Sequence, residues 1–361
     1  MEQLKSMVKA FSYYCGYYHL VDRFRRIRDK RGRLLVLTYH DLSDEPKPGT
    51  VEKELFELRP SVTKRQFESH LQMLKKRFKV VSLPDIVREI RGKGRLENDS
   101  VAITFDDGYE SFYRLAFPLL RKYDLPATMF LPTDFVSSQR MFWWDELLQI
   151  IFYAVPQRKS ASFLIPIIGE KLAKQFHSAG NDVRRRKEFL EFLEFYLRSI
   201  QDGQREEKIK NLKEILLPDQ DVKSASSKTL TWDQIAEMAR QGINFGSHTR
   251  SHLNLKFASL EKVEEELAKS KDAIEKNDKA RVVCFAYPYE VDFETHLGVK
   301  AILNDLKYEC ACTSLPGVNL SNLDPFFLKR MTLPMNASRP VIARELILGY
   351  SGRFKERSFS T

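Results

Sequence analysis

Two pairs of residues in this sequence have the types and spacing needed to bind a divalent metal ion and to move a proton. Asp106 and Asp107 stand side by side in VAITFDDGYESF, and His248 and His252 stand four apart in HTRSH. Adjacent carboxylates repel each other and lose hydration when they are buried. Two histidines with one carboxylate are a common ligand set for a catalytic metal ion, which offsets that cost for one aspartate. The other aspartate is then free to take a proton from water.

Both motifs also have a structural interpretation. An aspartate after a strand often caps the next helix or pairs with a lysine or arginine, and histidines four residues apart often lie on a helix surface. If HTRSH forms a helical turn, the two imidazoles project from the same face. Because capping by the aspartates leaves the histidines unexplained, the two motifs together favour a metal site.

Short apolar runs alternating with amphipathic stretches predict the elements that position these motifs. Runs typical of strands lie at 34–39, 79–83, 101–105, 127–131, 243–247, 282–286 and 308–312. Helical patterns lie at 63–78, 84–90, 111–122, 232–241, 260–275 and 296–306. About seven or eight strands alternating with helices favour a parallel α/β barrel, in which functional residues lie at the carboxyl ends of strands. The two aspartates, the two histidines and Tyr287-Pro288-Tyr289 each follow such a run.

The alternation stops near residue 136 and resumes near 231. FWWDELLQIIFYAV and RRRKEFLEFLEFYLRSI have apolar residues at helical spacing, and we expect 137–228 to be a mostly helical insertion ending in KSASSK. Thr231 with Gln234 then predicts a capping box for the next helix. We therefore divide the chain into a basic aromatic arm at 1–33 and a barrel domain at 34–350 that contains the insertion.

The net charge of +10 is concentrated at the N-terminus. Residues 1–33 hold nine basic and three acidic residues, interleaved with aromatic ones: Phe11, Tyr13, Tyr14, Tyr17 and Tyr18. This composition fits an interfacial helix drawn to anionic lipid. It also fits a terminal helix that packs its aromatic residues on the rest of the protein, and both interpretations remain open. Because no binding motif accompanies the charge, we expect no nucleic-acid partner.

The cysteines and apolar segments bear on the compartment. Cys15, Cys284, Cys310 and Cys312 lack the spacing of a zinc knuckle or a redox motif, and we expect Cys310 and Cys312 to pack in a strand. No segment reaches the ~18 apolar residues of a membrane span, and no signal segment with a cleavage site is evident. We expect a cytoplasmic protein, peripheral on the inner membrane face if the arm binds lipid.

Three motifs in the same order resemble those of a known family. TFDDG at 104–108, HTRSH at 248–252 and FAYPY at 285–289 are similar to the motifs of polysaccharide deacetylases of carbohydrate esterase family 4. The resemblance covers most of residues 34–335 apart from the insertion. It implies a distorted (β/α)7-type parallel barrel.

The resemblance also implies a role for each motif residue. Asp106 corresponds to the general base, and the backbone N–H of Tyr289 to a donor for the oxyanion. The implied metal ligands are Asp107, His248 and His252. Zn²⁺ suits two histidines and one aspartate, and Co²⁺, Ni²⁺ and Mn²⁺ are alternatives.

Two parts of the family's site are missing from their usual positions. No histidine follows His296, so the late histidine motif that supplies the general acid is absent. LTYHD at 37–41 resembles the YH segment of a circularly permuted subgroup, which makes His40 the candidate acid, although a lone histidine after a strand is also commonly structural. Ala286 replaces the family's arginine before the motif proline. Either Arg330 supplies that guanidinium or it is an exposed surface residue.

The resemblance implies hydrolytic removal of an N-acetyl or related N-acyl group from an amino sugar. The substrate would be a polysaccharide or a lipid-linked or nucleotide-linked glycan precursor. Trp143 and Trp144, at the start of the insertion, could stack on sugar rings or pack among the inserted helices. Two other functions are considered: hydrolysis of small non-sugar amides or cyclic imides, and glycan binding by an inactive site. The intact aspartate and histidine pairs argue against the inactive site.

Overall fold

The computed structural model describes residues 32–348 apart from several short gaps. The gaps are 94–95, 97–98, 139, 155–163, 181, 218–227, 279, 321–322 and 334–338, and positions 15, 17, 20, 21 and 23 are also described. The chain forms two compact units. We call Met1–Leu42, Val62–Ser137 and Thr229–Thr361 the barrel unit, and Ser43–Ser61 with Ser138–Lys228 the helical unit.

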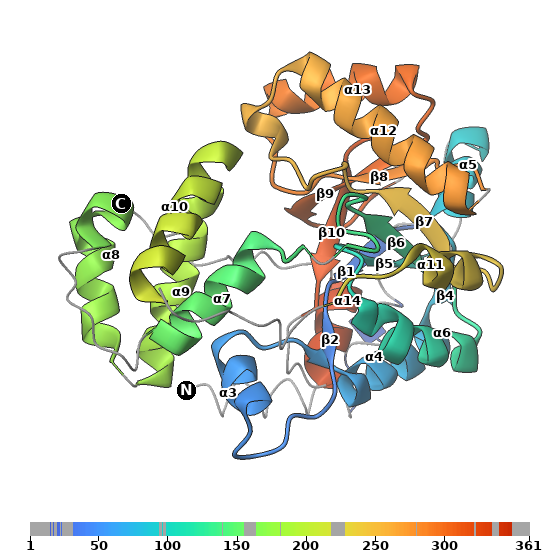
Figure 1. Ribbon diagram of the computed structural model, residues 1–361. Coiled ribbons are helices and arrows are strands. Elements are labelled where there is room, and N and C mark those ends of the chain that lie inside the picture. The colour runs from blue at the N-terminus through green and yellow to red at the C-terminus, as the bar shows by residue number, and fades with distance from the viewer. Residues whose placement is uncertain are drawn as a thin grey trace. The chain divides into compact units, whose positions relative to one another are not determined.

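Seven parallel strands close into a ring in the described part of the barrel unit (Figure 1). They are β1 (Leu34–Tyr39), β5 (Ser100–Phe105), β6 (Thr128–Leu131), β7 (Asn244–Ser247), β8 (Cys284–Ala286), β9 (Cys310–Pro316) and β10 (Leu328–Thr332). Strand β1 closes the ring because it pairs with β10 on one side and with β5 on the other. The short strand β4 (Lys79–Val80) pairs with the start of β5. The expected parallel (β/α) barrel is therefore confirmed.

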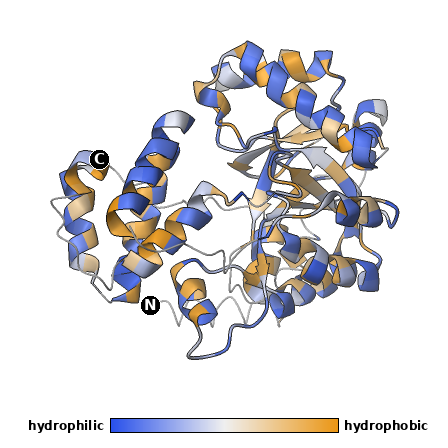
Figure 2. Cartoon of the chain, in the orientation of Figure 1, coloured by the Kyte–Doolittle hydropathy of each residue, from blue (hydrophilic) through white to orange (hydrophobic). Residues whose placement is uncertain are grey.

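Alternate residues of the strands belong to two hydrophobic clusters. Leu34 and Val36 of β1 lie in an inner cluster with Cys284, Cys310 and Cys312, whereas Leu35 and Leu37 lie in the cluster that the surrounding helices cover. Every residue of β1 and of β5 is buried, so these two strands are mostly apolar runs. In Figure 2 the helices around the strands carry both hydrophobic and hydrophilic residues. The expectation that Cys310 and Cys312 pack in a strand is confirmed.

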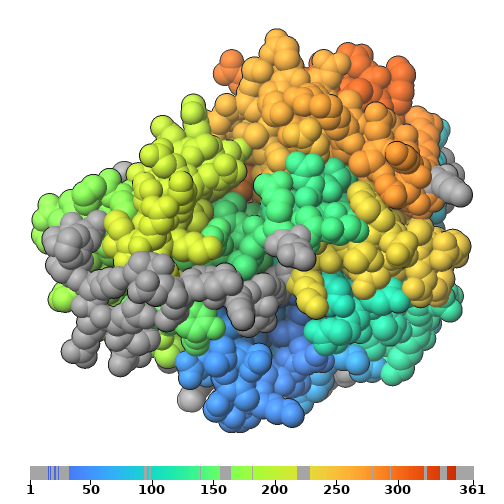
Figure 3. Space-filling model, viewed as in Figure 1, coloured from blue at the N-terminus to red at the C-terminus, as the bar shows by residue number. Residues whose placement is uncertain are grey.

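Helices surround the strands of the barrel unit. They are α4 (Lys64–Arg77), α5 (Leu83–Lys93), η1 (Phe112–Ala116), α6 (Phe117–Tyr123), α11 (Trp232–Ala239), η4 (Leu255–Phe257), α12 (Leu260–Asp278), α13 (Phe293–Asp305) and α14 (Arg339–Leu348). The predicted capping box of Thr231 and Gln234 is confirmed at the start of α11. Helices α12 and α13, orange in Figure 3, lie on the outside of this unit.

Helix α5 covers the amino-terminal end of the barrel. Its residues Ile86 and Val87 pack in the inner cluster, and Arg88 pairs with Glu309, just before β9, at 3.2 Å. The helix begins at Leu83, so the expected strand at 79–83 is confined to Lys79–Val80. With the amino-terminal end filled, the carboxyl ends of the strands are left for a site.

The described part of the helical unit contains five helices: α3 (Val51–Leu58), α7 (Trp143–Ala154), α8 (Ile165–Ala179), α9 (Val183–Arg198) and α10 (Asp202–Leu216). We expected an insertion at 137–228, and the structure groups 138–228 with the segment Ser43–Ser61. Leu58 at the end of α3 packs in the core of this unit, and Arg59 hydrogen-bonds to Asp145 of α7. The two-residue strands β2 (Leu42–Ser43) and β3 (Val62–Thr63) lie where the chain leaves and re-enters the barrel unit.

Two expectations concern residues that are mostly outside the described part. The basic arm at 1–33 is described only at the isolated positions given above and at residues 32–33, and of the KSASSK loop only Lys228 is described. Among the described helices, none combines the length and the apolar character that crossing a bilayer would require.

Candidate metal and hydrolytic site

The two adjacent aspartates follow β5 and are both buried. Asp107 has φ 71° and Gly108 has φ 65°, so the backbone turns sharply after Asp106. A Cβ at position 108 would lie 2.9 Å from a methyl group of Leu131, which requires glycine there. This turn directs the two carboxylates towards different partners.

Asp106 forms a buried ion pair with Arg330. The Nη1 of Arg330 lies 2.7 Å from Oδ1 of Asp106, and the Nε donates to the carbonyl oxygen of Thr313 at 2.8 Å. Arg330 is 5% exposed and lies in β10, so of the two interpretations of this arginine the structure excludes the exposed one. Burial raises the pKa of Asp106. The charge of Arg330, followed by those of His248 and His40, lowers the pKa by more than burial raises it, so the net shift is downward.

Asp107 lies beside both histidines. Its Oδ1 is 3.7 Å from Nε2 of His248 and 3.4 Å from Nε2 of His252. Ligand atoms of these three residues lie within 4.8 Å of one another, and all three side chains are buried. Two atoms bound at about 2.1 Å to a tetrahedral ion lie about 3.4 Å apart, so the spacing fits a bound metal ion.

A hydrogen bond fixes the tautomer of His248, and with it the protonation of the nitrogen that faces Asp107. Its Nδ1 lies 2.8 Å from the carbonyl oxygen of Ala286, which can only accept, so Nδ1 carries the hydrogen. Burial lowers the pKa of His248 to about 4, which leaves its Nε2 as an acceptor near neutral pH. Asp107 Oδ1 is buried and has no hydrogen-bond donor among the described residues. Two buried acceptors that face each other fit a cation between them.

The segment HTRSH is not a helical turn. The condition under which the two imidazoles would project from one helical face is therefore not met. The segment is a loop after β7, with left-handed φ values of 62° at Thr249 and 60° at His252. The imidazole rings of His248 and His252 nevertheless lie 4.9 Å apart, centroid to centroid. The histidines converge through the path of this loop.

His40 and Tyr289 both lie beside the aspartates and histidines. His40 follows β1, its side chain is 50% exposed, and its Nε2 is 3.9 Å from Oδ2 of Asp106. The ring of Tyr289 makes an edge-to-face contact with the ring of His252, with centroids 5.0 Å apart. The structure thus brings together every predicted site residue of the barrel unit: His40, Asp106, Asp107, His248, His252, Tyr289 and Arg330.

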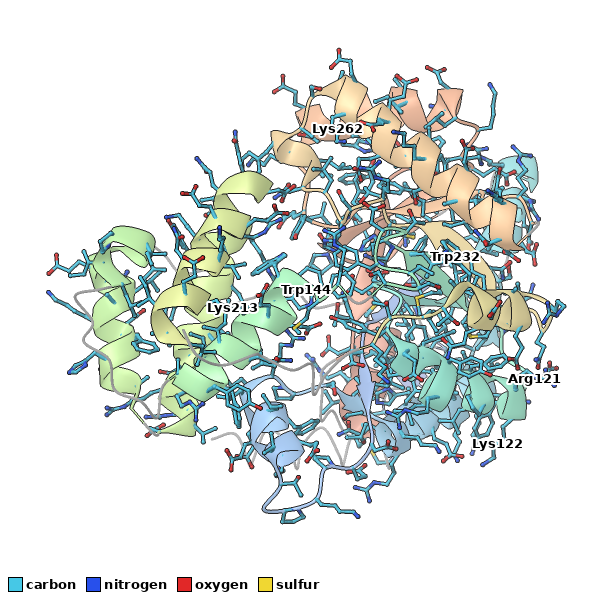
Figure 4. All side chains as sticks on the ribbon, viewed as in Figure 1. Arg121, Lys122, Trp144, Lys213, Trp232 and Lys262 are labelled. Carbon is cyan, nitrogen blue, oxygen red and sulfur yellow. The ribbon has the colours of Figure 1, made fainter. Side chains whose placement is uncertain are left out.

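Trp143 and Trp144 belong to the helical unit. Trp143 packs against the core of that unit, and the guanidinium of Arg205 lies 5.0 Å from its ring centroid. Trp144, labelled in Figure 4, stacks on Phe142 with centroids 4.7 Å apart. Both tryptophans therefore have packing partners within the unit.

Sequence reasoning missed two groups that support the site. The carbonyl oxygen of Thr313 accepts a hydrogen bond from Arg330 and orients its guanidinium. Glu266 of α12 accepts hydrogen bonds from the loop between the two histidines. No local pattern marks these residues, because the partners lie in other elements.

Comparison with known proteins identifies relatives in sequence. The chain is 33% identical over 121 residues to the poly-β-1,6-N-acetyl-D-glucosamine N-deacetylase of Staphylococcus epidermidis, covering 32% of this chain and 41% of the relative. It is 27% identical over 128 residues to the enzyme of that name from Escherichia coli K12, covering 34% and 18%. The matched segment spans less than half the length of either relative.

Two solved structures share the fold. The Streptococcus pyogenes deacetylase PplD in complex with acetate matches with a TM-score of 0.55 at 19% identity, covering 88% of this chain and 99% of that one. IcaB from Ammonifex degensii matches with a TM-score of 0.53 at 18% identity, covering 88% and 97%. At these identities the likeness concerns the fold alone.

The family itself is shown by the match along the sequence. Residues 93–185 and 203–310, more than half of the chain, match the polysaccharide deacetylase family. The matched residues run from before β5 to the start of β9 and include both aspartates and both histidines. The chain therefore belongs to the polysaccharide deacetylase family.

Proposed function

We propose that this protein removes an N-acetyl or related N-acyl group from an amino sugar by metal-dependent hydrolysis. The observation that carries the proposal is the cluster of Asp107, His248 and His252 beside the ion-paired Asp106, at the carboxyl ends of β5 and β7. Two sequence relatives are named as N-deacetylases of poly-β-1,6-N-acetyl-D-glucosamine, which supports an N-acetylated glycan as substrate. Family membership does not favour small amides, cyclic imides or an inactive binding module.

In this proposal Asp107, His248 and His252 hold the metal ion. We propose Zn²⁺, because two histidines and one carboxylate are a common zinc ligand set in hydrolytic sites. When bound, such an ion lowers the pKa of a water molecule and polarises the substrate carbonyl. The hydrogen bond from His248 to the Ala286 carbonyl keeps Nε2 available as a ligand atom.

Asp106 is the proposed general base. The charge of Arg330 counters the effect of burial on its carboxyl, so Asp106 is ionised and can accept the proton of the attacking water. Because Arg330 is itself held by the carbonyl oxygen of Thr313, it also fixes the orientation of the Asp106 carboxylate. Oδ1 is used by Arg330, which leaves Oδ2 for the water.

His40 is the proposed general acid for the departing amine. Its exposed imidazole lies on the Oδ2 side of Asp106, where it can reach both solvent and the leaving group. We propose that β1 takes the role of a C-terminal strand of other relatives, as in a circularly permuted barrel, and its pairing between β10 and β5 supports this. The backbone N–H of Tyr289 is the proposed donor to the developing oxyanion.

We retain Trp144 as the candidate that stacks on a sugar ring. Trp143 is the weaker candidate, because its ring packs against the helical core and lies next to Arg205. Replacing Trp144 by alanine should raise KM for a glycan oligomer more than for a monosaccharide, since a stacking contact contributes mainly to binding.

We also propose that the protein is cytoplasmic and makes peripheral contact with an anionic membrane through residues 1–33. The nine basic residues and six aromatic residues of this arm support the proposal. Co-sedimentation with phosphatidylglycerol vesicles tests it by comparing the full chain with a variant lacking residues 1–33. Equal sedimentation of the two proteins would argue against membrane contact by the arm.

The proposed reaction is tested by acetate release from a panel of substrates. The purified protein is incubated with poly-β-1,6-N-acetyl-D-glucosamine oligomers, nucleotide-linked and lipid-linked N-acetyl sugars, and small cyclic imides. We expect acetate release from at least one sugar class, its loss with a chelator, its return with added Zn²⁺, and no turnover of imides. Elemental analysis measures the metal content of the same sample.

Two outcomes would overturn the proposal. Acetate release that survives the chelator would remove the metal from the reaction, and preferential turnover of imides would replace the sugar substrate. The isosteric variant Asp106→Asn separates catalysis from binding, because it removes the proposed base and leaves the three ligand side chains in place.

A further inference from the structure

Glu266 is a buried carboxylate of α12 that has no part in the proposed reaction. It is 1% exposed and lies one turn after Lys262, which is labelled in Figure 4. A buried carboxylate is costly unless it is paired or hydrogen-bonded. The contacts that offset this cost indicate what the residue does.

One carboxylate oxygen of Glu266 binds the loop between the two histidines. Oε2 accepts from the backbone N–H of Arg250 at 2.9 Å, from the backbone N–H of Ser251 at 2.8 Å and from the Ser251 hydroxyl at 3.0 Å. Hydrogen bonds to an ionised acceptor are stronger than those between neutral groups. The charge of Glu266 therefore stabilises the loop at its centre.

The other carboxylate oxygen faces two cations. Oε1 of Glu266 lies 3.7 Å from Nε of Arg250 and 3.7 Å from Nζ of Lys262. The carboxylate of Glu266 therefore binds the loop backbone through one oxygen and faces two basic side chains with the other.

The loop needs such an anchor because its backbone is strained. Thr249 and His252 have left-handed φ values of 62° and 60°, which are unusual for residues other than glycine, and especially for a β-branched threonine. Such a conformation is unfavourable and persists only when surrounding contacts hold it. Glu266 binds the two residues that lie between them in the sequence.

The two ends of the loop are held differently. At the His248 end, the backbone N–H donates to the carbonyl oxygen of Leu131 and the imidazole donates to that of Ala286. At the other end, His252 follows directly after Ser251, whose N–H and hydroxyl both bind Glu266. The backbone N–H of Leu253, the next residue, also donates to the hydroxyl of Thr249 at 3.1 Å. The bonds to Glu266 thus contribute to the position of His252 relative to His248 and Asp107.

We propose that Glu266 is a positioning residue that sets the geometry of the metal ligands by holding the backbone of Arg250 and Ser251. The inference rests on the proposed function, since it takes Asp107, His248 and His252 as the metal ligands. Glu266 does not touch metal or substrate and acts through the loop. Supporting residues of this kind change metal affinity by about 10–100-fold when they are replaced.

The test compares two substitutions on the same helix in the full chain. Glu266→Gln keeps the shape of the side chain and removes its charge. Glu265→Gln is the matched control. Glu265 lies 3.7 Å from Nη1 of Arg250 and pairs with Lys262 and Lys269, and it makes no hydrogen bond to the backbone of the described loop 248–252. Zn²⁺ affinity is measured by titration of the metal-free proteins, and the visible absorption spectrum of bound Co²⁺ reports the ligand geometry.

We expect Glu266→Gln to bind Zn²⁺ about 10-fold more weakly than the wild type and to give an altered Co²⁺ spectrum, while Glu265→Gln stays within about twofold. Glu266→Ala should weaken binding about 100-fold. Because Glu266→Ala could unfold, all affinities are measured well below each metal-free protein's melting temperature.

The outcomes separate this inference from the proposed function. Unchanged Zn²⁺ affinity and an unchanged Co²⁺ spectrum in folded Glu266→Gln would overturn the positioning role, even if that variant melted at a lower temperature. A wild-type protein that binds neither metal would instead overturn the proposed function. Equal weakening by Glu265→Gln would attribute the effect to charge near Arg250 and also overturn the inference.

Discussion

Both units bury carboxylates, but they surround them differently. In the helical unit, buried Asp145 accepts a hydrogen bond from Arg59, and Glu194 lies 3.9 Å from the same guanidinium. In the barrel unit, Asp106 has an arginine partner, whereas the buried Oδ1 of Asp107 faces histidine nitrogens. The helical unit therefore places its acids beside an arginine side chain, and the barrel unit places one acid beside two imidazole nitrogens.

The pKa shifts differ in the same way. Burial raises the pKa of Glu194, and the nearby charges of Arg59 and Arg198 do not reverse the shift. Burial also raises the pKa of Asp107, but the neighbouring imidazoles, first of all that of His252, make the net shift downward. Burial of a carboxylate alone thus does not mark a site. The arrangement of ligand atoms around an ionised acceptor does.

The largest expected effect tests the special position of Asp107. Asp107→Ala should abolish stoichiometric Zn²⁺ binding and lower acetate release by about 1,000-fold or more, because it removes a metal ligand from the proposed reaction. Retained Zn²⁺ binding would show that the buried Asp107 is not a metal ligand, and the contrast with the buried carboxylates of the helical unit would be lost.

The next effect separates the two adjacent aspartates. Asp106→Asn should lower kcat for acetate release by about 100-fold or more, because the proposed base is lost, while Zn²⁺ affinity stays within a few-fold. Single-turnover kinetics and metal titration of the same sample measure both quantities. If Zn²⁺ affinity fell as far as kcat, the two carboxylates would share one role instead of having two.

The pH dependence of stability should differ between the units. Burial lowers the pKa of His70 in the barrel unit to about 4, so the unfolded chain takes up a proton below about 6.5 before the folded chain does. Its contribution is complete above about pH 6.5 and falls by about 2 kcal/mol at pH 5. The raised pKa of Glu194 acts with the opposite sign, favouring the folded helical unit as the pH falls.

His70→Gln tests this contrast by thermal unfolding between pH 7 and pH 5. The melting temperature of the wild type should fall more steeply on acidification than that of the variant, because glutamine has no proton to gain. Identical slopes for the two proteins would rule out His70 as a source of the pH dependence.

The smallest expected effect concerns the ion pair of the helical unit. Asp145→Asn should lower the free energy of unfolding by about 1 kcal/mol, because it weakens the bond to Arg59. The loss is small because Arg59 is partly exposed and still has Glu194 as a second partner. Thermal denaturation measures the loss, and Zn²⁺ titration at 20 °C should match the wild type. A loss of Zn²⁺ binding would mean that this ion pair has more than a structural role.

Local sequence predicted the elements well where the controlling residues are neighbours. The capping box of Thr231 and Gln234 needs residues only three apart, and the strand runs at 34–39 and 101–105 are buried on both faces. HTRSH was different. Glu266, 14 positions beyond His252, binds Arg250 and Ser251 between the two left-handed residues, and no periodicity in HTRSH itself reports that contact.

Long-range contacts explain the other differences. Sequence left the environment of Arg330 open because its partner, Asp106, is 224 positions away. The segment 43–61 contains a short amphipathic helix, and nothing in its own sequence shows that it belongs to the helical unit. Its membership involves a contact with a distant residue, the bond from Arg59 to Asp145. In each case the sequence shows both residues but does not show that they are in contact.

The sequence by itself determined which reactive residues the site contains. They are two aspartates after one predicted strand, two histidines after another, and His40 after the first strand of the chain. It also determined the alternation of strands and helices, because apolar periodicity is a local property. Only the tertiary structure decided that Asp106 faces Arg330 while Asp107 faces His248 and His252. The physical reason is that barrel closure and the turn at Asp107 join groups from distant strands, and only then do burial and charge give two adjacent carboxylates different surroundings.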